Sequence, residues 1–144
     1  MLPPVYFLAA IVSAVILHYV LPIDQLIRYP WRFIGLIPLV TGIVLNLLAD
    51  HAFKKYETTV KPFAKSSVLV TGGVFAVSRN PMYAGMMLIL FGIAVMLGSL
   101  MPFVIVAFTG FLLNRLFVVP EEKMLEEIFG DEFRQYRRRV RKWI

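Results

Sequence analysis

Residues 84–113 read AGMMLILFGIAVMLGSLMPFVIVAFTGFLL and decide the fold, because these 30 positions hold no charged residue. A membrane-spanning helix needs about 20 apolar residues, so the run is too long for a single span. Gly98 and Ser99, followed by Pro102, offer a tight turn within it. The sequence therefore predicts a hairpin of two membrane helices, 82–97 and 100–118.

Two further apolar runs, 5–21 and 33–49, precede the hairpin. The chain is 59% hydrophobic with a mean hydropathy of +0.75, well above that of an ordinary soluble domain. We expect a single domain over 1–144 with an all-α fold: an integral membrane bundle of four transmembrane helices. A C-terminal amphipathic helical cap over 121–143 completes it.

The basic residues cluster in the 50–80 connection and in the C-terminal tail. With four spans, the N-terminus, this connection and the C-terminus share one side of the membrane, which the positive-inside rule makes cytoplasmic. The net charge of +6 fits nucleic acid or an anionic membrane surface, and the apolar runs favour the lipid bilayer over nucleic acid. The chain has no cysteine, and its two histidines do not suggest a metal site.

The tail predicts two amphipathic helices. Gly130 ends the first, and Asp131 is placed to cap the second. Apolar side chains recur at helical spacing in the second helix, opposite a basic face. They are Phe133, Tyr136, Val140 and Trp143. We expect this helix to lie on an anionic leaflet, as an anchor at least.

Polar clusters flank the hairpin. Arg79 precedes Pro81, which is well placed to start a helix, and a free helix N-terminus with a nearby cation favours a carboxylate ligand. Glu121 and Glu122 follow Pro120 and are expected to begin another helix. For Arg79, snorkelling to the membrane surface is the alternative. For the two glutamates it is an ordinary first-turn or helix-surface position, and Glu121 is the better candidate for a ligand contact.

Three other groups of polar residues lie within or at the ends of the apolar runs. Arg115 and Asn114 lie near the end of the last apolar run, as functional groups or as snorkelling ones. Asn46, Asp50 and His51 end the second run and either line the same cavity or cap that helix. His18 is expected at the outer end, as a hydrogen-bonded structural histidine.

Four motifs together resemble a known family. They are Val70-Thr71-Gly72-Gly73-Val74-Phe75, Arg79-Asn80-Pro81-Met82-Tyr83-Ala84-Gly85, Glu121-Glu122 followed by Leu125, and Phe129-Gly130 followed by Phe133, Tyr136 and Val140. In order and spacing they are similar to the isoprenylcysteine carboxyl methyltransferase and phospholipid methyltransferase group. These integral membrane enzymes use S-adenosylmethionine, and the resemblance covers about residues 58–143.

The resemblance implies a cofactor site on the cytoplasmic side. The implied cofactor contacts are Ser67, Val68, Leu69, Val70, Gly73, Phe75, Asn80, Pro81, Tyr83 and Glu121. The implied catalytic residues are Arg79, Tyr83 and Arg115, the last near the family's substrate-side arginine. Asn80 stands where many relatives carry His, and Phe75 stands where Tyr is frequent.

The expected activity is transfer of a methyl group to an amphiphilic acceptor with a carboxylate or amine head. An NADPH-dependent membrane reductase of the sterol-reductase type and a non-catalytic membrane adaptor are the alternatives. Oligomeric state is left open, since glycines such as Gly85, Gly92, Gly98 and Gly110 permit helix association but do not require it.

Overall fold

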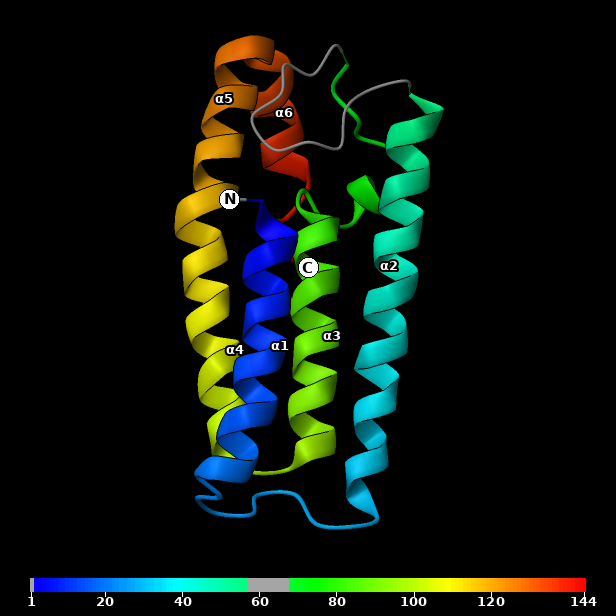
Figure 1. Ribbon diagram of the computed structural model, residues 1–144. Coiled ribbons are helices and arrows are strands. Elements are labelled where there is room, and N and C mark those ends of the chain that lie inside the picture. Colours follow the sequence, from blue (N-terminus) through cyan, green and yellow to red (C-terminus); the bar gives the residue numbers. More distant parts are fainter. Residues whose placement is uncertain (1, 57–67) are drawn as a thin grey trace.

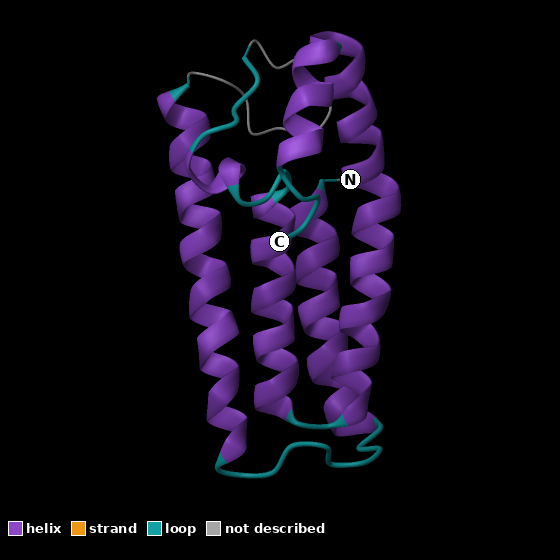
Figure 2. Ribbon diagram, turned by 180° about the vertical axis from the view of Figure 1, so that it is seen from behind, coloured by secondary structure: helices purple, strands orange, loops and turns teal. Residues whose placement is uncertain are grey.

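The computed structural model describes residues 2–56 and 68–144, and the predicted contact Ser67 lies outside them. Four long helices run side by side (Figure 1), and the described residues contain no β-strand (Figure 2). These are α1 (Pro3–Val20), α2 (Leu36–Lys55), α3 (Pro81–Leu97) and α4 (Leu100–Leu113). α2 packs against α3, and α1 packs against α3 and α4. The prediction of an all-helical fold is confirmed.

Three of the described helices are long and apolar enough to cross a membrane, namely Pro3–Val20, Trp31–Lys55 and Leu100–Phe129. α3 is apolar but shorter, at 17 residues. The number of membrane spans therefore stays a prediction. The bounds of α3 and the start of α4 agree with the predicted hairpin to within one residue, whereas the end of its second helix does not.

The turn between α3 and α4 is where the sequence placed it. Gly98 adopts a left-handed conformation with φ of +76°, which glycine tolerates far better than other residues. Its carbonyl accepts hydrogen bonds from the backbone N–H groups of Leu26 and Ile27. A side chain at Gly98 would collide with the Ile27 carbonyl. The turn thus ties the α3–α4 hairpin to the connection that leads into α2.

The second helix is longer than predicted. It begins with a 3-10 turn at Trp31–Gly35 and continues through α2 to Lys55, so residues 50–55 of the expected 50–80 loop are helical. Residues 50–55 contain no glycine or proline that would end the helix at Ala49. Asp50 and Lys54 form an ion pair at 2.6 Å one turn apart, and Lys54 and Lys55 suit the negative end of the helix dipole.

The prediction of a helix break before Glu121 is wrong. One helix runs from Leu100 to Phe129, passing through a π-helical segment at Asn114–Val118 and into α5 (Val119–Phe129). Pro120 lacks a backbone N–H, and its ring clashes with a carbonyl one turn earlier in a regular α-helix. A wider π turn directly before it relieves both problems, and such turns are frequent at functional sites.

Paired glycines set the distance between α2 and α3. A Cβ built on Gly42 would lie 2.5 Å from the Gly85 carbonyl oxygen, and one on Gly35 equally close to that of Gly92. Both pairs are seven residues apart on their helices, so they lie on one contact face. Gly85 and Gly92 therefore serve packing within this chain, and their partners Gly35 and Gly42 were not identified from the sequence.

The C-terminal cap packs on the protein. α6 (Asp131–Arg139) buries Phe133 and Tyr136, together with Val140, against partners from the connection and from α5. These partners are Leu69, Leu125 and Phe129. The apolar face of α6 is thus covered by protein, which corrects the expectation that it faces lipid.

The end of α6 also differs from the prediction. Asp131 is the first helical residue, and no side chain caps the helix N-terminus. The helix ends at Arg139, and Val140 is extended. The strap, residues 140–143, leaves α6 and runs back toward α3, where Arg141 forms a parallel bridge with Ser78.

The N-terminus, the last turn of α2, the start of α3 and the cap lie at one end of the bundle (Figure 1). At the other end, the Nδ1 atom of His18 lies 2.7 Å from Ser99 Oγ. The interpretation of His18 as a hydrogen-bonded structural histidine is confirmed.

Candidate active site

A buried ion pair joins the start of α3 to α5. Arg79 Nε donates to Glu122 Oε1 at 3.0 Å, with 8% and 12% of the two side chains exposed. Asn80, directly before the helix, donates from Nδ2 to the same carboxylate oxygen at 3.0 Å. Charge-assisted hydrogen bonds of this kind are stronger than neutral ones. These bonds hold the corner, residues 79–81 at the start of α3, in a fixed position relative to α5.

The same corner holds the strap. The Arg79 guanidinium donates to the carbonyl oxygens of Arg137 and Val140, at 3.0 and 3.1 Å. Asn80 Nδ2 donates to the Lys142 carbonyl at 3.0 Å. Because these donors are already used, the geometry shows Arg79 and Asn80 fastening the C-terminal segment.

Tyr83 and Glu121 form a second pair, one helical turn further into the bundle. The Tyr83 hydroxyl donates to Glu121 Oε1 at 2.8 Å. Tyr83 is buried, and its ring stacks on Phe117 at 6.4 Å between centroids, within a cluster that includes Leu113 and Val118. Glu121 is only partly buried, and one of its carboxylate oxygens is held by Tyr83.

The segment before the corner bridges α2 and the cap. Leu69 packs against the α6 cluster, whereas Val70 packs toward α2 with Phe75. Phe75 meets Phe53 of α2 edge to face, with centroids 5.1 Å apart. The Tyr136 hydroxyl donates to the Phe75 carbonyl at 2.6 Å, and burial raises the pKa of this tyrosine above its ordinary value. Tyr136 thus remains a neutral donor.

The structure brings together most of the predicted site residues at this end. Pro81 is fully buried, whereas Val68 and Gly73 are exposed, and a Cβ on Gly73 would meet nothing within 4 Å. Arg115 is exposed and lies over the Phe111 ring at 5.7 Å, apart from the hydrogen-bonded groups of the corner. Its catalytic role stays a prediction.

The second group of candidates lies along α2. Asn46 packs against Gly85, and its Oδ1 atom is buried without a hydrogen-bond partner. Asp50 is paired with Lys54, and His51 is exposed. Among the described residues no cluster of His, Cys, Asp or Glu could hold a metal ion.

Glu122 and the strap were not identified from the sequence. Glu122 was expected to be an ordinary surface charge, but it is buried against Arg79 and Asn80. Adjacent residues on a helix point about 100° apart, which is why Glu121 and Glu122 face different partners. The other partners of Arg79 are backbone carbonyl groups, which every residue has, so no residue type in the sequence indicates them.

Fold and site define a helical membrane protein with a polar site at the end of the bundle where the C-terminal cap lies. The family of phospholipid methyltransferases matches residues 31–132, and the chain belongs to this family. The resemblance drawn from the motifs is thereby confirmed.

Two kinds of relative match by sequence. An uncharacterized protein of Haemophilus influenzae is 35% identical over 63 residues, which are 44% of this chain and all of that protein. A protein-S-isoprenylcysteine O-methyltransferase of Schizosaccharomyces pombe is 34% identical over 79 residues, or 53% of this chain and 32% of its own. A probable enzyme of the same name from Oryza sativa subsp. indica is 31% identical over 75% of this chain and 58% of its own.

A solved structure of the eukaryotic intramembrane Ras methyltransferase, isoprenylcysteine carboxyl methyltransferase, is similar in fold. The TM-score is 0.70 at 25% sequence identity, over 98% of this chain and 51% of that one. The chain thus spans about a third to three fifths of the methyltransferases that it matches.

Proposed function

We propose that this protein is an S-adenosylmethionine-dependent methyltransferase that modifies a lipid-like acceptor with a small carboxylate or amine head. In this proposal all four long helices cross the membrane, and the end with the cap is cytoplasmic. The observation that carries the proposal is the Tyr83–Glu121 pair, which joins the first turn of α3 to the start of α5 in a chain of this family.

The residues present fit the cofactor. S-adenosylmethionine carries cationic groups and a ribose diol, which a carboxylate accepts, and a flat adenine ring, which apolar side chains accommodate. Glu121 supplies a partly accessible carboxylate. The buried cluster of Phe75 and Val70, packed on Phe53, supports the segment that leads to the corner, and the open backbone at Gly73 permits close approach of a ligand.

The cofactor supplies an activated methyl group on a sulfonium, so the protein's task is mainly to position the reactants. Holding reactants in attack geometry contributes about 7–11 kcal/mol toward lowering a barrier. Tyr83 fixes one Glu121 oxygen, and the Arg79–Glu122 pair fixes the helix that carries it. The apolar cluster around Phe117 keeps water from the inner side of the site.

The acceptor's chemistry decides whether a base is needed. A carboxylate acceptor is already nucleophilic, whereas a protonated amine first loses a proton. The relatives named as isoprenylcysteine methyltransferases support a carboxylate, and the family name supports a phospholipid amine. In either case the amphiphile enters from the bilayer and its head reaches the polar end of the bundle.

Calorimetry on the detergent-purified protein tests the proposal. S-adenosylmethionine and S-adenosylhomocysteine are titrated into the wild type, Glu121→Gln and Glu127→Gln, with NADPH as the comparison ligand. Glu127 is an exposed carboxylate on the same helix and is the matched control. We expect binding of both methionine-derived ligands, weakened by Glu121→Gln alone. Binding of NADPH alone identifies a reductase, and binding of none of the three favours the adaptor.

A further inference from the structure

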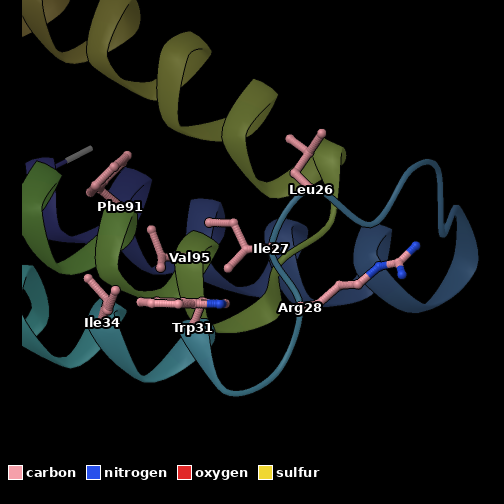
Figure 3. A pocket seen from close by; sticks show the side chains of 7 residues that line it. All are labelled: Leu26, Ile27, Arg28, Trp31, Ile34, Phe91 and Val95. Atoms are coloured by element: carbon pink, nitrogen blue, oxygen red, sulfur yellow. The ribbon is translucent and has the colours of Figure 1, made fainter.

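A groove lies at the end of the bundle opposite the candidate active site, and Figure 3 shows the side chains that line it. It has a volume of about 430 Å³, within the range of small-molecule sites. Its walls come from the α1–α2 connection, the start of the second helix and the end of α3. The lining residues are Leu26, Ile27, Arg28, Trp31, Ile34, Phe91 and Val95. Val95 is 12 residues beyond Tyr83 on α3, or about 18 Å along the helix, so this groove is separate from the candidate active site.

The groove is amphipathic along its length. Phe91 and Val95 lie one turn apart on α3, and Trp31 and Ile34 lie one turn apart on the facing helix. Their side chains gather together in Figure 3, whereas the Arg28 guanidinium extends away from them. An apolar slot that ends at a cation matches a molecule with a hydrocarbon tail and an anionic head.

Arg28 is free to bind such a head. The neighbouring Arg32 is used inside the protein, where it donates to Gln25 and to the Ile27 carbonyl oxygen. Arg28 is exposed and, within residues 2–56 and 68–144, forms no ion pair or side-chain hydrogen bond. Its positive charge is therefore unbalanced by a protein partner.

The surroundings of the groove identify the source of the ligand. The helix Trp31–Lys55 is long and apolar enough to cross a membrane. Tyr29 and Trp31, 76% and 67% exposed, stand at its start, where aromatic side chains mark the boundary between lipid and water. The mouth with Arg28 is thus at headgroup level, and the apolar slot is within the hydrocarbon layer.

We propose that this groove binds one anionic glycerophospholipid of the adjacent leaflet. An acyl chain lies between Ile34 and Val95, and the phosphate lies at Arg28. This site is independent of the proposed methyl transfer, since none of its residues contributes to the corner, the strap or the Tyr83–Glu121 pair.

Native mass spectrometry of the full chain, released from a mild detergent, tests the site. Phosphatidylglycerol and phosphatidylcholine of equal chain length are titrated in parallel. Arg28→Gln removes the head contact, and Ile34→Trp fills the slot from a half-exposed position that tolerates the change. Arg139→Gln removes an exposed cation at the other end and is the matched control.

We expect the first phosphatidylglycerol to bind more tightly than phosphatidylcholine. Arg28→Gln should reduce that preference about fivefold, the contribution of one basic residue near a lipid surface. Ile34→Trp should weaken binding of both lipids, and Arg139→Gln should leave the first binding step unchanged. Equal losses in Arg28→Gln and Arg139→Gln, or undiminished binding in Ile34→Trp, would overturn the proposal, because the lipid would then bind elsewhere.

Discussion

Arg79 Nε lies 3.0 Å from Glu122 Oε1 in a pair that is about nine-tenths buried, and the same guanidinium holds two carbonyl groups at the end of α6. One side chain thereby connects the start of α3 with α5 and with the end of α6, which lie 43 or more residues further along the chain. The strap closes over the α3 corner because Arg79 and Asn80 donate to its backbone. The C-terminal residues are consequently part of the site's framework.

Arg79→Met should lower the free energy of unfolding by about 3–5 kcal/mol, because it leaves the Glu122 carboxylate buried without its cation. Thermal unfolding in detergent measures the effect. Arg134→Met is the control, since Arg134 pairs with Glu126 at the surface with 57% and 33% exposure, where an ion pair contributes little to stability. Equal effects of the two substitutions would show that the buried pair contributes no more than a surface one.

Tyr83→Phe should weaken S-adenosylmethionine binding about tenfold, because the Glu121 carboxylate loses the donor that orients it. The measurement is a double-mutant cycle in binding affinity with Glu121→Gln, in which coupled residues give non-additive losses. Tyr29→Phe, at an exposed position on the opposite end, is the control and should leave the affinity unchanged. Additive losses in the cycle would separate the two residues and remove the proposed role of Tyr83.

The sequence predicted those features that depend on local pattern. The uncharged run with Gly98-Ser99 located the turn between α3 and α4 to within a residue, because a left-handed glycine ends a helix in a recognisable way. Pro120, by contrast, led to the wrong prediction of a helix break. Proline interrupts a regular helix, but a π turn immediately before it lets the helix continue, and no residue type signals that turn.

The sequence predicted which residues lie at the candidate site, but it did not predict which partners they bind. Arg79, Tyr83 and Glu121 do meet at one end of the bundle. The partners of Arg79 are backbone carbonyls and a glutamate 43 residues away, and neither leaves a spacing pattern in the sequence. Glu122 binds the corner and Glu121 binds Tyr83, and this difference between the two glutamates follows from tertiary packing.

Gly42→Ala should destabilise the protein by about 1–3 kcal/mol, because the new methyl group would lie 2.5 Å from the Gly85 carbonyl and push α2 from α3. Gly110→Ala is a matched control. Its nearest contact is the flexible end of Met87 at 3.2 Å, which is able to move. Thermal unfolding of the two variants should differ clearly, and a Gly42→Ala protein as stable as Gly110→Ala would exclude close α2–α3 packing.

Tyr136→Phe should destabilise the protein by about 0.5–1.5 kcal/mol at neutral pH, because the hydrogen bond to the Phe75 carbonyl is lost. The destabilisation caused by Tyr136→Phe should depend on pH. Burial raises the pKa of Tyr136 in the folded state, so its stabilising contribution is fully present below the unfolded value of about 10.

Above that pH the unfolded tyrosine ionises while the folded one keeps its proton, and the wild type loses up to about 1.4 kcal/mol per pH unit from this residue. Phenylalanine does not ionise. The stability gap between wild type and Tyr136→Phe should therefore be constant from about pH 7 to about pH 9 and shrink above about pH 10. Unfolding curves of both proteins across this range measure the gap. A gap that stays constant into the alkaline range would mean that Tyr136 ionises equally well in the folded state, and that the contact with Phe75 does not bury its hydroxyl.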